Sequence, residues 1–194
     1  MSTHPDLTVA ARRIAGLVDS VGDDALGRPT PCEGYTVGDL LDHIAGAAVA
    51  FTAAAVKQPL DGGPRGDAAN LGDDWRTRIP QEVLGLAQAW RSPHAWTGMT
   101  AAGGVDLPGD LAGVVALDEL VIHGWDLAKA TGQPYDVDDE TLAACHGFVA
   151  QFSAPGQEAS REGLFGPPVE VPDDAPLLDR LIGLSGREPE WSPG

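Results

Sequence analysis

Apolar side chains recur along most of this chain at spacings of three and four residues, which is the period of amphipathic α-helices. Residues 8–26, for example, place Ile14, Leu17, Val18 and Val21 on one face. The same period predicts further helices over residues 36–57, 75–90, 111–131 and 139–153, and a shorter one over 175–184. The sequence contains no internal repeat. It also shows no convincing alternation of apolar and polar residues, which is the pattern that predicts strands. The predicted fold class is therefore all-α, in the form of an antiparallel helix bundle.

The predicted helix boundaries depend on residues that start or stop helices. Thr36 begins a sequence typical of a capping box, in which its hydroxyl accepts a hydrogen bond from a backbone amide. Gly132 and Pro134 stand where a C-cap and a helix stop occur. Pro80 lies inside the third predicted helix, where it either kinks that helix or restarts it. Residues 59–74 are rich in glycine and have no period, so they are predicted to form a surface loop and a candidate lid.

Length, charge and cysteine content exclude several classes of protein. The chain has 194 residues, enough for a domain with a buried core, and its 12 Lys and Arg against 29 Asp and Glu give a net charge of −17. Such a charge repels phosphate backbones and anionic lipid, which argues against nucleic-acid and membrane partners. With no run of about 18 apolar residues and no signal-like N-terminus, we expect a cytoplasmic protein. Cys32 and Cys145 lie far apart, so neither a disulfide framework nor a thiolate zinc site is expected.

The predicted helix over residues 111–131 carries ionisable residues within an apolar sequence. At about 100° per residue, one narrow sector contains Glu119, His123 and Asp126, together with alanines and between larger apolar side chains. An inward-facing carboxylate is costly unless a cation or several hydrogen bonds replace water, and a metal ion is one such cation. Glu119 and His123 are four residues apart, so their side chains lie one turn apart on the same face, close enough to bind one ion.

His43 is the candidate third ligand. It lies at the edge of the apolar face of the predicted helix over residues 36–57, beside Ala47, Ala50 and Ala54. These small side chains leave space for a ligand site between helices. Two imidazoles and one carboxylate with open positions are typical of catalytic zinc sites and are compatible with nickel or iron(II).

The same residues allow other interpretations. A Glu-x-x-x-His pair also occurs as an exposed pair on a helix, and a buried histidine is commonly bonded to a backbone carbonyl. Asp126 either orients His123 or is solvated near the helix end. Cys32 is either a reactive thiol near a helix N-terminus or a small buried residue in a turn. Three arginines either pair with an anionic substrate or lie on the surface: Arg76, Arg78 and Arg161. Three histidines are expected outside the site: His4, His94 and His146.

Two segments of the chain resemble a known family. The first is Thr30-Pro-Cys-Glu-Gly-Tyr-Thr-Val-Gly-Asp-Leu-Leu-Asp-His43, and the second is Asp118-Glu-Leu-Val-Ile-His-Gly-Trp-Asp-Leu-Ala128. Together they resemble the actinobacterial metal-binding family related to mycothiol-dependent maleylpyruvate isomerase, in its N-terminal domain. That family belongs to the DinB-like superfamily of four-helix bundles. The resemblance implies a DinB-like metal-binding bundle with an additional helix over residues 1–155, and a short C-terminal tail over residues 156–194 packed on it.

The resemblance also implies a metal site and a thiol cosubstrate. The family's metal ligands match His43 in the first segment and Glu119 and His123 in the second. Mycothiol is the thiol that the resemblance implies, in a transfer to a small electrophile or in an isomerisation through such an adduct. Tyr35 stands where the family usually has Trp. The isomerase itself has a further C-terminal domain that contributes to its active site, which the short tail does not obviously replace.

Three functions fit these observations. The first is a mycothiol-dependent transferase or isomerase acting on an unknown small electrophile. The second is a metal-dependent hydrolase in which Asp126 or another carboxylate acts as the base. The third is a metal-binding or stress-response bundle without catalysis, because a fold and a set of ligands do not establish turnover. The expected partners are a small-molecule thiol and its electrophilic substrate, and the protein is expected to be a monomer or a homodimer.

Overall fold

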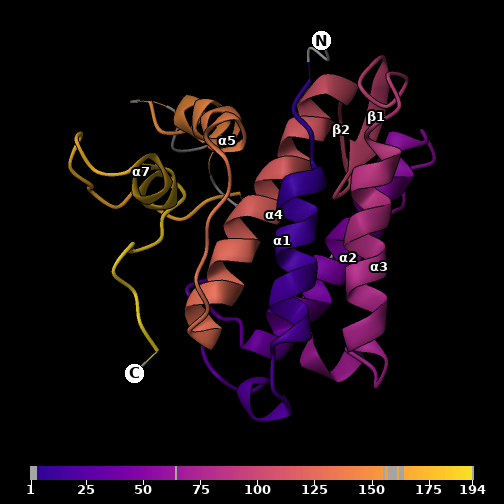
Figure 1. Cartoon of the computed structure of the whole chain (residues 1–194). Coiled ribbons are helices and arrows are strands. Elements are labelled where there is room, and N and C mark those ends of the chain that lie inside the picture. Colours follow the sequence, from indigo (N-terminus) through magenta and orange to yellow (C-terminus); the bar gives the residue numbers. More distant parts are fainter. Residues whose placement is uncertain (1–3, 64, 155, 157–160, 162–163, 194) are drawn as a thin grey trace.

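The structure is mostly helical and includes one small sheet (Figure 1). The computed structural model describes residues 4–63, 65–154, 156, 161 and 164–193. Its helices are α1 (Thr8–Asp19), α2 (Val37–Ala55), α3 (Trp75–Ala89), α4 (Gly109–Thr131), α5 (Asp139–Gln151) and α7 (Leu177–Leu184). The predicted helix over residues 8–26 is too long, because α1 ends at Asp19 and residues 23–25 form a separate 3₁₀ turn. Helix α3 continues through Pro80, so that proline does not restart it.

A two-stranded hairpin corrects the all-α prediction. Strands β1 (Met99–Ala102) and β2 (Val105–Pro108) pair antiparallel, with Ala102 opposite Val105. The turn between them is Gly103-Gly104, and both glycines have positive φ, at 61° and 80°. Two-residue hairpin turns of type I′ need positive φ at both central positions, and glycine adopts it without steric cost. The sequence pattern missed this hairpin because its strands have only four residues each, too few for a visible alternation.

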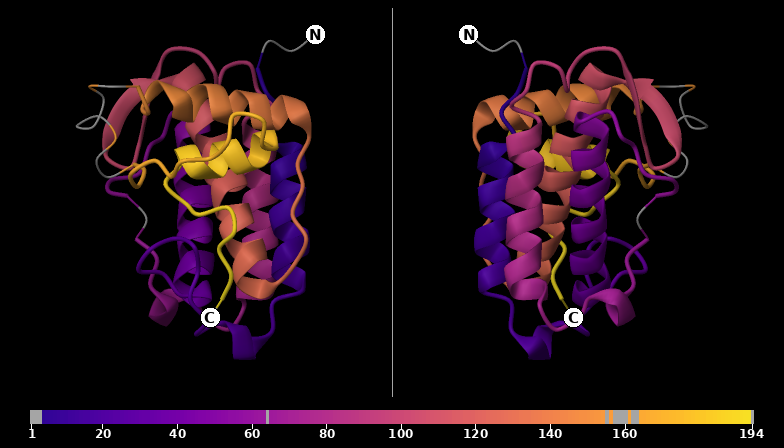
Figure 2. Two further views of the ribbon diagram at one scale, coloured as in Figure 1. Left: turned by 90° about the vertical axis from the view of Figure 1, so that its left-hand side faces the viewer. Right: turned by 90° about the vertical axis from the view of Figure 1, so that its right-hand side faces the viewer.

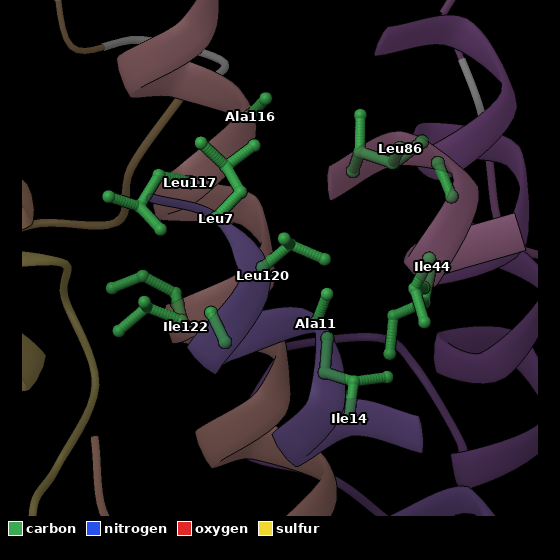
Figure 3. Packing of buried hydrophobic residues seen from close by; sticks show 14 of the residues in the cluster. Leu7, Ala11, Ile14, Ile44, Leu86, Ala116, Leu117, Leu120 and Ile122 are labelled. Carbon is green, nitrogen blue, oxygen red and sulfur yellow. The ribbon is translucent and has the colours of Figure 1, made fainter. Parts of the chain in front are cut away.

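Helices α1 to α4 pack side by side and enclose the main apolar core (Figures 1 and 2). Each of the four contacts two others, since α1 and α2 each lie against both α3 and α4. Figure 3 shows part of this core, where apolar side chains from the four helices converge, among them Leu7, Ala11, Ile14, Ile44, Leu86, Ala116, Leu117 and Leu120. The apolar faces predicted from the sequence are therefore the buried faces.

Helices α5 and α7 lie outside this group, with α5 against α4 and α7 against α5 (Figures 1 and 2). They pack mainly against each other, and three phenylalanine rings, of Phe148, Phe152 and Phe165, form edge-to-face and tilted contacts between α5 and the segment that precedes α7. The predicted division of the chain into residues 1–155 and 156–194 stays a prediction, and residue 155 lies outside the described residues.

The start of α2 is fixed as the sequence predicts. The Thr36 hydroxyl accepts from the Asp39 amide, and the Asp39 carboxylate accepts from the Thr36 amide at 2.9 Å, which completes a capping box. The same carboxylate accepts from the Ala68 amide at 2.7 Å, so the loop over residues 59–74 is attached to the first turn of α2. By length and composition α2 could cross a membrane, but it is mostly buried inside the protein, as core helices are.

Asp39 is expected to stabilise the protein at neutral pH and not in acid. The hydroxyl and amide of Thr36 and the amide of Ala68 bond its carboxylate and hold the pKa of Asp39 below its ordinary value. Because the folded pKa lies below the unfolded value near 3.9, this stabilisation is present above that pH and is lost as pH falls through the folded pKa. Asp39→Asn should therefore lower the free energy of unfolding in urea by about 1 kcal/mol at neutral pH. A difference that stays constant into acid would contradict this origin.

Candidate metal centre

Three ionisable side chains from two helices meet at one point. His43 comes from α2, and Glu119 and His123 come from α4, with one ligand atom of each within 4.8 Å of the other two. His43 Nε2 lies 3.2 Å from Glu119 Oε2, and His123 Nε2 lies 3.4 Å from the same oxygen. The two imidazole rings meet nearly at right angles, with centroids 4.7 Å apart. The predicted ligand candidates, 76 residues apart along the chain for His43 and Glu119, are therefore neighbours in space.

The spacing of these donor atoms fits a metal ion. In a tetrahedral site with metal–nitrogen and metal–oxygen bonds of about 2.0–2.2 Å, neighbouring ligand atoms lie roughly 3.3 Å apart. The two nitrogen–oxygen distances of 3.2 and 3.4 Å around Glu119 match that separation. Two nitrogens and one oxygen leave at least one coordination position for another ligand, which is the composition of catalytic zinc sites.

Asp126 holds the ring of His123 in this orientation. Its Oδ2 lies 2.9 Å from His123 Nδ1, and because a carboxylate only accepts, this contact places a proton on Nδ1 and directs Nε2 toward Glu119. The Asp126 side chain has no exposed surface. Its charge is balanced by Arg187, whose Nε donates to Oδ1 at 3.1 Å and whose Nη2 donates to Oδ2 at 2.9 Å. A carboxylate behind a ligating histidine is the usual support of a metal site.

The cluster shifts the pKa values of its members. Burial alone would raise the pKa of Glu119, but hydrogen bonds and positive charge from His123 and His43 outweigh it and hold that pKa far below its ordinary value. From its inward-facing position we expect burial to raise the pKa of Glu119 in the absence of metal, and this expectation is wrong because His123 and His43 outweigh the effect of burial. For His123, burial favours the neutral ring, yet bonds from Asp126 and Glu119 raise its pKa to about 9.

These residues form the floor of a cleft of about 440 Å³. One wall is the segment before α2, with Pro31, Cys32, Glu33 and Tyr35. The opposite wall, which we call the C-terminal wall, consists of residues 164–167 and 185–187. The cleft volume lies in the range of small-molecule sites. The candidate lid, residues 59–74, does not line this cleft in the described part of that loop, although the Gly66 amide donates to the Tyr35 hydroxyl at 3.1 Å.

Glycines allow the two segments of the C-terminal wall, residues 164–167 and 185–187, to approach each other closely. Gly186 has φ of 87°, and a Cβ atom on it would lie 2.6 Å from the backbone of Gly166. The wall is also held from behind by Arg161, whose Nε donates to the Gly166 carbonyl at 2.6 Å and whose Nη2 donates to the Leu184 carbonyl. Arg161 is therefore a buried supporting residue and not a surface or substrate-pairing arginine.

The other proposed auxiliary residues lie elsewhere. Arg76 pairs with Asp23, and Arg78 pairs with Asp74 and Glu82; neither arginine lines the cleft of the candidate centre. Histidines 4, 94 and 146 belong to no group of potential metal ligands among the described residues.

Cys32 faces the candidate centre from the side of Asp126. Its sulfur lies within 4.8 Å of ligand atoms of His123 and Asp126. Burial, and then the charge of Asp126, raise the pKa of its thiol to about 11, so the position does not activate this cysteine as a nucleophile.

Two residues of the site have no signal in the sequence pattern. Arg187 lies in a proline- and glycine-rich segment without a period, so nothing in the sequence links it to Asp126. Asp118 precedes Glu119 on α4 and lines the same cleft, but the helical wheel does not distinguish it from a solvated carboxylate. It is 5% exposed, and burial raises its pKa well above the ordinary value.

The chain is similar to proteins of one family. The family described as "Mycothiol maleylpyruvate isomerase N-terminal domain" matches residues 7–128. Two uncharacterized proteins of Mycobacterium tuberculosis, MT0763 of strain CDC 1551 / Oshkosh and Rv0738 of strain ATCC 25618 / H37Rv, are each 28% identical to this chain over 182 residues. In both cases the match covers 89% of this chain and 91% of the relative.

A solved structure has the same fold. The crystal structure of the mycothiol-dependent maleylpyruvate isomerase matches with a TM-score of 0.67 at 17% identity, and the match covers 95% of this chain and 89% of that chain. The structural match therefore extends beyond residue 155, into the segment predicted as a short tail.

The pairing of Arg187 with Asp126 is expected to contribute strongly to stability. Arg187→Met leaves a fully buried carboxylate without its cation, and breaking a buried ion pair in this way costs roughly 3–5 kcal/mol. Urea unfolding should show this loss. In the double variant Arg187→Met with Asp126→Asn the charge is gone as well, so much of the stability should return. Equal losses in the single and double variants would show that the unpaired charge of Asp126 is not the cause of the lost stability.

Proposed function

This chain belongs to the family of mycothiol maleylpyruvate isomerase N-terminal domains, and from that premise we propose that it is a metal- and mycothiol-dependent transferase or isomerase acting on a small electrophile. The observation that carries the proposal is the convergence of His43, Glu119 and His123 on the floor of an open cleft. In this proposal the helices α1 to α4 form a DinB-like four-helix bundle that holds a divalent ion, with zinc as the first choice and nickel or iron(II) as alternatives.

In this proposal the residues in and behind the cleft have different roles. His43, Glu119 and His123 would hold the ion, and Asp126 would keep His123 directed toward it. When bound there, a divalent ion lowers the pKa of a coordinated thiol, so that the thiolate is available as a nucleophile at neutral pH. Arg187 lines the cleft beside these residues and holds Asp126 in place through its ion pair.

The two alternative functions have less support. A hydrolase that uses Asp126 as the base requires that carboxylate to reach a water molecule in the cleft. Asp126 has no exposed surface, and its oxygens are bonded to His123 and Arg187. A non-catalytic metal-binding or stress-response protein does not need an open cleft of about 440 Å³ above its metal ligands.

The proposal also covers the partners of the protein, its location and its oligomeric state. A net charge of −17 is unfavourable for binding nucleic acid or anionic membranes, so we propose small molecules as its partners. We also propose that the protein acts in the cytoplasm, where low-molecular-weight thiols are kept reduced, as a monomer or a homodimer.

Purified protein is expected to carry about one divalent ion per chain, bound through His43, Glu119 and His123. His43→Ala or His123→Ala should remove stoichiometric metal and leave the helical circular dichroism unchanged, because each substitution deletes one ligand at the cleft floor. Elemental analysis by mass spectrometry measures the loss. His94→Ala is the matched control, since His94 is exposed and outside the site, and it should retain the ion. Retention of metal by both ligand variants would refute the assignment.

Cobalt substitution is expected to report the thiol directly. A thiolate that joins the metal's ligands should add a sulfur-to-metal charge-transfer band in the near ultraviolet, because thiolate is a soft ligand with high affinity for such ions. The band should appear with mycothiol, be absent with S-methylated mycothiol, and be lost in His123→Ala. If mycothiol leaves the cobalt spectrum unchanged, the thiol mechanism fails, and the hydrolase and non-catalytic alternatives take its place.

A further inference from the structure

Asp118 is a buried carboxyl group that the fold does not use. Its side chain lies on α4 and lines the cleft, and the residue is only 5% exposed. The buried Oδ1 atom has no hydrogen-bond partner in the part of the chain that the structure describes. Arg187, which also lines the cleft, directs its hydrogen bonds to Asp126 and to the Ser185 carbonyl instead.

An unbonded carboxyl oxygen at this depth weakens the fold. Leaving a buried acceptor without a donor is unfavourable, and more so for a charged group, whereas an apolar side chain of similar shape would carry no such cost. The other buried carboxyl group of the site, Asp126, is bonded on both oxygens, so the fold is able to satisfy such groups here. The position of Asp118 therefore has its use when something else enters the cleft.

We propose that Asp118 is a ligand-binding residue that hydrogen-bonds a neutral N–H or O–H group of the molecule whose sulfur occupies the candidate metal centre. This inference rests on the proposed function, because it assumes that a thiol enters this cleft. Asp118 and Glu119 line the same cleft, so the bonded group must belong to the part of the ligand that lies close to the sulfur. A carboxyl group in either protonation state offers an acceptor oxygen to such a group.

The cleft favours a neutral donor over an ammonium group. Arg187 already lines it, and the proposed divalent ion would add two further positive charges at its floor. Arg187 is already paired with Asp126, so the repulsion of a second cation on the ligand would come from the divalent ion. Amide N–H and hydroxyl groups have no such penalty, and mycothiol carries both kinds, whereas a simple alkanethiol such as ethanethiol carries neither.

The test compares these two thiols on cobalt-substituted protein. Asp118→Leu removes both acceptor oxygens with little change in size, and Asp118→Asn is the second variant, which keeps one. Binding of mycothiol, measured by titration of the charge-transfer band and by calorimetry, should weaken about tenfold or more in Asp118→Leu and less in Asp118→Asn. Binding of ethanethiol and the metal content should stay within twofold of the wild type. Asp110→Asn, an exposed carboxylate in the first turn of the same helix, should change neither affinity.

Stability provides an independent readout. Because Asp118 is unbonded in the fold, both variants should melt at or above the temperature of the wild type in the absence of thiol. A lower melting temperature in both would show that Asp118 stabilises the fold, and would overturn the inference. An unchanged affinity for mycothiol in Asp118→Leu would also overturn the inference. A parallel loss of ethanethiol binding and metal content would overturn it too, because Asp118 would then act through the metal ligands.

The same titrations separate the two proposals. If ethanethiol produces the band and wild-type protein binds mycothiol no more tightly than ethanethiol, the inference about Asp118 fails and the thiol chemistry stands. If mycothiol binds without any band, and Asp118→Leu weakens that binding, the thiol chemistry fails and Asp118 remains a ligand-binding residue. If wild-type protein binds neither thiol, both proposals fail.

Discussion

The ion pair between Asp126 and Arg187 is the interaction on which the candidate site depends. Asp126 is fully buried, so its charge must be balanced inside the protein, and Arg187 supplies two hydrogen bonds for that purpose. Asp126 Oδ2 also accepts a hydrogen bond from His123 Nδ1, and this bond orients the imidazole ring. One pair therefore connects the C-terminal wall to α4 and fixes a metal-ligand candidate at the same time.

The cleft is lined partly by residues on packed helices and partly by residues on irregular segments. The three ligand candidates come from α2 and α4, whose packing in the apolar core fixes their relative positions (Figure 3). The rest of the cleft comes from irregular segments, residues 31–35 before α2 and the C-terminal wall. Irregular segments tolerate changes in sequence better than packed helices do. The candidate metal ligands thus lie on helices of the packed core, and the rest of the cleft lining lies on segments that can vary without disturbing that core.

Local signals in the sequence predicted most of the helices, whereas a short hairpin and the contacts between distant segments were missed. Thr36 and Gly132 act within one turn of their own helices, and both predictions are confirmed. The hairpin was missed because two glycines in a row indicate a turn without indicating what flanks it. Arg187 was missed because its role depends on a partner 61 residues away, which no periodic pattern records. The pKa of Glu119 was predicted with the wrong sign, since the sequence pattern gives neither the hydrogen bond from His123 nor the approach of His43.

The 61 residues between Asp126 and Arg187 affect the order of events during protein synthesis. Helices α1 to α4 end at Thr131, so the ribosome completes all of them, and both segments that carry the ligand candidates, well before it reaches Arg187. Until Arg187 is made, Asp126 lacks the residue that balances its charge in the folded protein. The candidate metal ligands are therefore synthesised before the segment that completes the ion pair behind His123.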